Sequence, residues 1–132
     1  MSVIYVHHRV ACRPRERSAV TDRLSSEGAE RVSELGGALY GLWLSQIGLP
    51  RDTVTAITVW PNTDAAVRLA DLLHDEDPGI DTVELDLMSP TLRPESAEPP
   101  RWQGNYAFRW FETPAENFLE FLPEYPCYAY KG

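Results

Sequence analysis

Three histidines are the side chains in this sequence best suited to acid–base chemistry near neutral pH. His7 and His8 are adjacent in an apolar, β-branched segment, so on a strand they face opposite sides and cannot bind one metal ion together. His74 stands at the end of a helical pattern, beside the acidic run Asp75–Asp77. Nothing in this spacing predicts a metal site. A histidine acting as general base stays open as an alternative. The simpler interpretation is one half-buried, hydrogen-bonded strand histidine, two solvated ones, and an acidic run that forms a solvated turn.

Carboxylates and aromatic residues supply the remaining candidates. Glu84 and Asp86 share one face of a predicted strand, where they could pair for acid–base work or form a solvated or interface-lining face. The four tryptophans are the heaviest apolar groups, and such residues are typical of cores or dimer contacts. The sequence has no P-loop, dinucleotide fingerprint, zinc-ligand spacing or nucleophile elbow. We therefore expect no cofactor and no covalent or nucleotide-dependent mechanism.

Composition excludes several classes of partner. The 132 residues are 43% hydrophobic, enough for a well-buried core. Twelve basic residues against 20 acidic ones give a formal charge of −8, which repels phosphate backbones and anionic lipid. We expect neither nucleic acid nor membrane as a partner, since no apolar run approaches the roughly 20 residues that cross a bilayer. The N-terminus lacks the pattern of a secretory signal, and the only cysteines are Cys12 and Cys127. Both features favour a reduced, cytoplasmic protein.

A strand and a helix at the N-terminus must position the first two histidines. Val3–Cys12 is rich in β-branched and aromatic residues and predicts a strand. Its more apolar face should lie on the core and comprises Ile4, Val6, His8, Val10 and Cys12. Pro14 suits the first turn of a helix that runs from Arg15 to about Leu35 and is interrupted by Gly28. Its apolar positions are Val20, Leu24, Val32 and Leu35. Gly36-Gly37 ends this helix with a left-handed cap.

A hairpin between Gly36 and Trp60 forms the centre of the pattern. The runs Ala38–Ile47 and Thr53–Trp60 predict two strands, and the Gly, Pro and Asp of residues 48–52 suit the loop between them. Asn62 or Thr63 can cap the next helix, with Asp64 in its first turn. The buried stripe of that helix comprises Ala66, Leu69, Ala70 and Leu73. Asp81–Met88 then predicts a strand that directs Val83, Leu85 and Leu87 to one face and Glu84, Asp86 and Met88 to the other.

The order βαββαβ predicts an α+β, ferredoxin-like fold in which two helices cover one face of a four-stranded antiparallel sheet. We expect this domain to span residues 1–93. Large side chains such as Tyr40, Trp43 and Trp60 belong to the sheet, and some of them must point to the uncovered face. A bare apolar sheet face is an association surface, so a homodimer that packs sheet against sheet is the economical arrangement.

Residues 94–103 are rich in proline and predict an extended connector, and residues 104–132 predict one more strand and a short helix. The strand is Asn105–Glu112, and the helix starts at a capping box, residues 113–116, with Pro114 in its first position. Arg9 and Pro14 recur as Arg109 and Pro114, a spacing of 100 residues. This region is therefore interpreted as a partial second repeat of the same unit.

The stretch GALYGLWLSQIG, the following VTAITVW and the Asn62-Thr63-Asp64 helix start resemble NIPSNAP-family proteins of the dimeric α/β-barrel superfamily. The resemblance covers about residues 2–93, with a second repeat beginning near residue 104. It implies that two subunits form a barrel, with any ligand pocket between sheet and helices or inside the barrel. The superfamily includes small cofactor-independent monooxygenases.

Two functions stay open on this basis. The first is a NIPSNAP-like barrel that binds a small molecule or serves as an assembly module, without turnover. The alternative is a cofactor-independent monooxygenase or isomerase that acts on an aromatic or polyketide-like small molecule. In the resembled oxygenases an aromatic pocket holds a flat substrate, so the candidate site residues here are His8, Tyr40 and Trp43.

Overall fold

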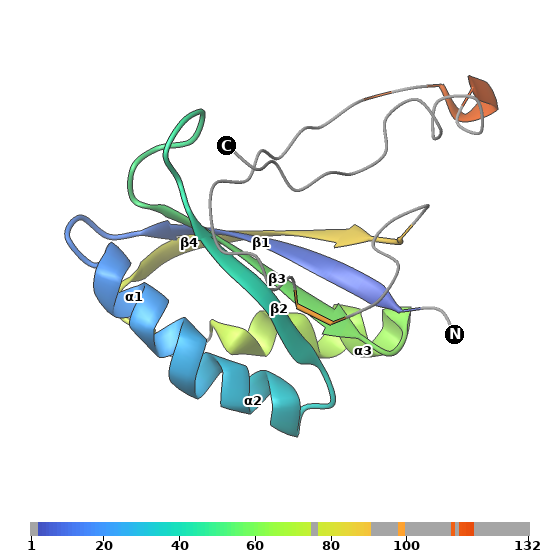
Figure 1. The fold of residues 1–132 in the computed structure, drawn as a ribbon, viewed down its shortest axis with the longest axis horizontal. Coiled ribbons are helices and arrows are strands. Elements are labelled where there is room, and N and C mark those ends of the chain that lie inside the picture. The colour runs from blue at the N-terminus through green and yellow to red at the C-terminus, as the bar shows by residue number, and fades with distance from the viewer. Residues whose placement is uncertain (1–2, 75–76, 91–97, 100–111, 113, 118–132) are drawn as a thin grey trace. The chain divides into compact units, whose positions relative to one another are not determined.

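The computed structural model describes residues 3–74, 77–90, 98–99, 112 and 114–117 (Figure 1). The chain divides into two compact units, Met1–Ser89 and Pro90–Gly132. The first unit contains strands β1 (Ile4–Cys12), β2 (Ala38–Leu44), β3 (Thr53–Trp60) and β4 (Ile80–Met88). Its first helical segment is α1 (Arg17–Arg23), η1 (Leu24–Gly28) and α2 (Ala29–Glu34). Its second is α3 (Thr63–Leu69) and η2 (Ala70–Leu73).

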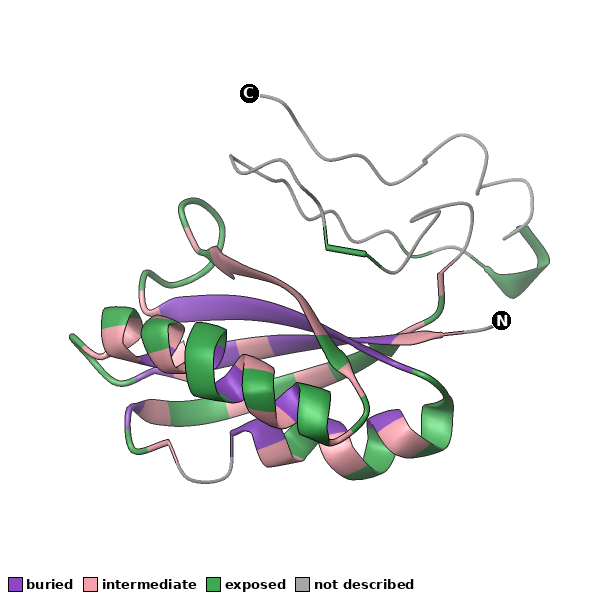
Figure 2. Cartoon of the chain, turned by 60° about the horizontal axis from the view of Figure 1, so that its bottom comes forward, coloured by how far each residue is buried: buried purple, intermediate pink, exposed green. Residues whose placement is uncertain are grey.

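The four strands form one antiparallel sheet in the order β2-β3-β1-β4. Both helical segments lie on one side of this sheet (Figure 1). This order and layering confirm the predicted ferredoxin-like α+β fold. The two central strands of the sheet are β1 and β3, and β2 and β4 form its edges. Every residue of the central strand β3 is buried (Figure 2).

A β-bulge at Tyr40 decides which way the aromatic residues of β2 point. Leu39 pairs with Thr58, but the next pair is Gly41 with Ile57, so Tyr40 is an extra residue on its strand. The bulge places Tyr40 on the same face as Trp43, three positions further along. Simple alternation would have separated these two side chains. Strand β2 also ends at Leu44 and not at the predicted Ile47, because residues 45–52 form the connecting loop.

The first helical segment starts later than predicted. Pro14 lies in a turn ahead of the helix, because Arg15 has φ 70° and the helix begins only after Glu16. Instead of a simple interruption at Gly28, a π-helical turn, η1, joins α1 and α2. The predicted left-handed cap is confirmed at Gly36, where φ is 93°. The apolar stripe is also confirmed: Val20, Leu24 and Val32 are buried and Leu35 packs against them.

The second helical segment follows its predicted pattern until its last turn. The Asn62 side-chain oxygen accepts a hydrogen bond from the Ala65 backbone N–H at 2.8 Å, which confirms the predicted cap. The final turn, η2, has 3-10 geometry, and His74 is its C-terminal cap residue. The stripe predicted for this helix packs onto the core with Ala66, Leu69, Ala70 and Leu73.

One main core lies between the sheet and the helices. It joins strand residues such as Val6, Val10 and Val54 to helix residues such as Val20 and Val32. The predicted core face of β1 is confirmed. Trp60 is the largest fully buried side chain. A Cβ atom on Gly37 would lie 2.9 Å from the Trp60 ring, so the chain passes this ring where only glycine fits.

Several expectations fall in the second unit, where few residues are described. The predicted strand Asn105–Glu112 lies outside the described residues except for Glu112, and Arg109 of the repeat lies outside them too. Of the predicted helix, a short 3-10 turn, η3 (Ala115–Asn117), is present, in which the Asn117 N–H donates to the Pro114 carbonyl at 2.9 Å. The domain boundaries stay a prediction.

The burial of Trp60 predicts that its replacement destabilises the fold. Trp60→Ala should lower the free energy of unfolding by about 3–5 kcal/mol, because it empties the largest side-chain site of the core. Chemical denaturation monitored by circular dichroism measures this loss. Val67→Ala is the matched control: Val67 is 63% exposed, so its change should stay within about 0.5 kcal/mol. Equal effects for the two variants would contradict this assignment of the core.

Candidate functional site

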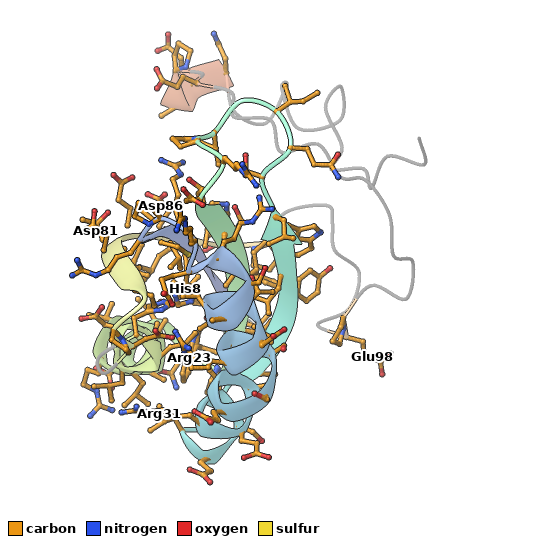
Figure 3. All side chains as sticks on the ribbon, turned by 90° about the vertical axis from the view of Figure 1, so that its left-hand side faces the viewer. His8, Arg23, Arg31, Asp81, Asp86 and Glu98 are labelled. Atoms are coloured by element: carbon orange, nitrogen blue, oxygen red, sulfur yellow. The ribbon has the colours of Figure 1, made fainter. Side chains whose placement is uncertain are left out.

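A hydrogen-bonded network of His8, His74, Thr58 and Trp60 lies inside the main core; we call it the interior histidine network. His8 Nδ1 lies 2.8 Å from His74 Nε2, and His8 Nε2 lies 2.8 Å from Thr58 Oγ1. The Trp60 indole N–H donates to the same Thr58 oxygen at 2.7 Å. His8 and Thr58 are 0% exposed, and Figure 3 shows His8 among the side chains between sheet and helices. The network therefore connects β1, β3 and the end of η2 away from solvent.

Donor and acceptor counting favours one arrangement of protons in this network. The Trp60 indole can only donate, so the Thr58 hydroxyl accepts that bond and has its own hydrogen left to donate to His8 Nε2. His8 then carries its proton on Nδ1 and donates to His74 Nε2. This assignment satisfies both hydrogen-bonding groups of His8 with neutral rings.

Burial keeps His8 uncharged. Its pKa falls from the ordinary 6.5 to about 3, mainly because burial penalises the charged form, and secondarily because His74 and His7 lie near. The interpretation of two solvated histidines is wrong: His7, His8 and His74 are 3%, 0% and 8% exposed. His74 is buried because η2 turns it back onto the sheet, and His7 is buried because it lies in a central strand.

The second sheet face, opposite the helices, carries a separate cluster of apolar and aromatic side chains. Tyr5, Ile57 and Val59 form its buried centre. Val3, Tyr40, Trp43 and Met88 pack against that centre. The Tyr5 and Tyr40 rings meet edge to face with 5.3 Å between their centroids. The Trp43 ring lies over Gly41, where any Cβ atom would overlap it. These rings form an aromatic surface on one half of this face.

Charged residues occupy the other half of the second sheet face. Arg9 pairs with Glu84 at 3.0 Å, and the strand register places His7 directly across from Asp86. Burial lowers the pKa of His7, and the Arg9 charge lowers it further, whereas Asp86 acts in the opposite direction. An imidazole thus lies between a cation and a carboxylate, beside the aromatic surface.

The structure does not bring all the predicted site residues together. Tyr40 and Trp43 share the second sheet face, whereas His8 lies on the helix side of the sheet. A ligand on either face therefore cannot contact all three side chains. His7, on the same face as Tyr40, is the histidine placed near the aromatic residues.

Thr58 and His74 were missed as partners of His8. Side chains alternate between the two faces along β3, which puts Thr58 on the same face as Trp60. A polar residue on that apolar face indicates a buried hydrogen-bond partner. No comparable signal exists for His74, because its approach to His8 depends on how η2 packs, across 66 residues of sequence.

Neither a metal cluster nor a membrane-spanning helix is found where the chain is described. Residues 3–74, 77–90 and the short stretches beyond them contain no group of three or more His, Cys, Asp or Glu side chains able to hold a metal ion. Among the same residues, no helix is long and apolar enough to cross a bilayer.

The fold resembles several solved structures. A NIPSNAP family protein of unknown function from Agrobacterium tumefaciens is 23% identical, with a TM-score of 0.54 over 70% of this chain and 92% of that one. A second NIPSNAP family protein from the same organism is 20% identical, with a TM-score of 0.55 over 71% and 99%. An uncharacterized NIPSNAP-like domain protein from Burkholderia xenovorans is 18% identical, with a TM-score of 0.55 over 76% and 95%. No protein-family model and no curated protein matches the sequence.

These similarities define the class of protein as α+β and ferredoxin-like. Within that class, the chain has a NIPSNAP-like fold, as its sequence resemblance predicted. At these identities the likeness concerns the fold, and function has to be argued from the residues.

The interior histidine network makes a prediction about Thr58. Thr58→Val keeps the side-chain shape but leaves the Trp60 N–H and His8 Nε2 without their shared partner. We expect a loss of about 1–3 kcal/mol of unfolding free energy for each group left unpaired. Urea denaturation measures the loss, and the exposed Thr82→Val provides the control, expected within about 0.5 kcal/mol. A Thr58→Val protein as stable as the wild type would contradict the network.

The lowered pKa of His8 predicts how stability depends on pH. The unfolded chain binds a proton at His8 below about pH 6.5, whereas the folded chain does so only near pH 3. The contribution of His8 is therefore complete above about pH 6.5 and is lost as the pH falls toward 3, by up to about 1.4 kcal/mol per pH unit. Denaturation curves across this range should show a shallower decline for His8→Gln. Parallel declines would contradict the shift.

Proposed function

We propose that this protein is a homodimeric α/β-barrel module in which the second sheet faces of two copies pack together. The observation that carries the proposal is that Tyr40 and Trp43, on the face opposite the helices, are only half-buried and extend the apolar cluster beyond its buried centre. An antiparallel sheet that faces water on one side normally carries polar residues there. Contiguous apolar and aromatic surface on a sheet instead favours association.

The charges beside this cluster suit a symmetric partner. In a two-fold dimer the same patch meets itself, so each cation needs an anion within the patch. Arg9 and Glu84 provide that combination, and their side chains are 33% and 71% exposed, so both keep capacity to contact a second copy. The barrel fold implied by the resemblance forms by the same pairing of sheets.

Light scattering coupled to gel filtration tests the dimer. The full chain should elute with about twice the mass of one subunit at micromolar concentration. Trp43→Glu puts a charge into the aromatic surface and should shift the protein to monomer. Val67→Glu adds the same charge on α3, where Val67 is already 63% exposed, and should leave the dimer intact. A monomeric wild type, or equal behaviour of the two variants, would overturn the proposal.

Small-molecule binding at the aromatic surface is the second function that we propose. Tyr5 and Tyr40 pack edge to face, and the Trp43 ring lies beside Gly41. Such aromatic rings suit the binding of a flat aromatic ligand. Native mass spectrometry of the purified protein should detect a bound small molecule that Trp43→Ala loses. Turnover as a cofactor-independent monooxygenase or isomerase would use His7 as the base on this face, because His8 lies on the other.

A cytoplasmic location is also part of the proposal. Cys12 is a free, buried thiol, and burial raises its pKa. Such a protonated, enclosed thiol suits a reducing compartment. Fractionation of cells that express the tagged full chain tests this location.

A further inference from the structure

The loop that joins β2 to β3 exposes apolar side chains to water. It comprises residues 45–52, which makes it longer than the roughly two to five residues common in hairpins, and we call it the β2–β3 loop. Ile47 within it is 95% exposed, and Leu49 is 39% exposed. Leu44, the last residue of β2, is 47% exposed. These are three of the five exposed large hydrophobic side chains among the described residues, so this surface is concentrated at one end of the hairpin.

The β2–β3 loop is held in one shape by its own contacts. Ser45 Oγ donates a hydrogen bond to the Leu49 carbonyl at 3.0 Å, which closes the loop around Ile47. Gly48 has φ 97°, a left-handed conformation that favours glycine. The exposed apolar side chains therefore belong to an ordered loop, and less conformational entropy is lost when such a loop meets a partner.

Two hydrogen bonds attach the end of this loop to the rest of the first unit. Arg17 of α1 donates through Nη1 to the Arg51 carbonyl at 2.9 Å. The Cys12 N–H, at the end of β1, donates to the Asp52 carbonyl at 2.8 Å. These bonds fix the direction in which the loop leaves the sheet. Figures 1 and 3 show it projecting beyond the ends of β2 and β3, away from the helices.

The homodimer proposed above places a second copy on the side to which this loop projects. The helices cover one face of the sheet, so a copy that packs on the second sheet face lies on the side away from them. Trp43 is half-buried on that face and stands two positions before the loop begins. The aromatic surface therefore continues along β2 into the exposed apolar side chains of the loop.

Charge also favours a second copy as the occupant. Arg51 is exposed, and its guanidinium makes no ion pair with the described residues. Glu84 and Asp86 on β4 are exposed carboxylates on the second sheet face. In a two-fold dimer each copy offers the loop cation and these carboxylates to the other. The formal charge of −8 repels nucleic acid and anionic lipid as alternative partners.

From these observations we propose that the β2–β3 loop is a dimerisation arm, which packs against the second copy with Ile47 as its anchor. This inference rests on the homodimer proposed above. Ile47 and Leu49 leave water on contact with the other copy, and Arg51 approaches the acidic half of that copy's second sheet face. Each dimer contains two such arms.

Sedimentation of the full chain at a series of concentrations tests the arm by measuring the dimer Kd. Ile47→Ala removes three carbon atoms, and each carbon buried in an interface is worth about fourfold in Kd. We expect a loss of at least about tenfold for each arm, hence about a hundredfold for the dimer. Val67→Ala trims an exposed side chain on α3 and should leave Kd unchanged. An unchanged Kd in Ile47→Ala overturns the proposal.

The Trp43→Glu variant separates this inference from the dimer on which it rests. A monomeric wild type overturns the homodimer and the arm together. A dimeric wild type that Trp43→Glu dissociates, but Ile47→Ala leaves unweakened, overturns the arm alone.

The charge of the arm is tested by Arg51→Glu. This variant brings like charges together and should raise Kd at low salt, by a factor that shrinks as added salt screens the repulsion. An unchanged Kd at low salt overturns the approach of Arg51 to the acidic half of the other copy.

Nuclear magnetic resonance of a mixed dimer shows directly what the arm touches. One chain carries ¹³C-labelled isoleucine methyl groups and the other is unlabelled. The Ile47 methyl groups should show nuclear Overhauser effects to protons of the unlabelled chain. Effects confined to the labelled chain would mean that the loop packs on its own chain, and they would overturn the proposal.

Discussion

The hydrogen-bond chain from Trp60 through Thr58 to His8 and His74 is the interaction on which the packing of this molecule depends. It brings four polar groups into a core that is otherwise apolar, and each is tolerated because the next one satisfies it. Losing one member leaves its direct neighbours in the network without their hydrogen-bond partner. It also links three elements far apart in sequence, so it selects one way of closing the helices onto the sheet.

The same sheet has two faces with different chemistry. On the helix side, burial against α1, α2 and α3 keeps His8 neutral and hydrogen-bonded. On the second sheet face, aromatic rings lie next to His7, Arg9 and Asp86. His7 and His8 are adjacent on β1 but therefore lie in different environments, His7 on the second sheet face and His8 in the main core. The interior histidine network and the aromatic cluster are separated by the thickness of a single sheet.

Local irregularities contribute to both faces. The bulge at Tyr40 brings it onto the face that carries Trp43, and the smallness of Gly41 leaves room for the Trp43 ring. On the helix side, the 3-10 geometry of η2 directs His74 into the core. These departures from regular geometry decide which side chains meet on each face of the sheet.

The sequence by itself determined the order of elements, the caps at Gly36 and Asn62, and the apolar stripes, because these follow from local geometry and from the periods of strands and helices. It placed His8 on the core face of its strand for the same reason. Only the tertiary structure decided that His74 meets His8 and that Tyr40 joins Trp43. The first depends on packing between distant segments and the second on one extra residue in a ladder, and neither leaves a periodic signal in the chain.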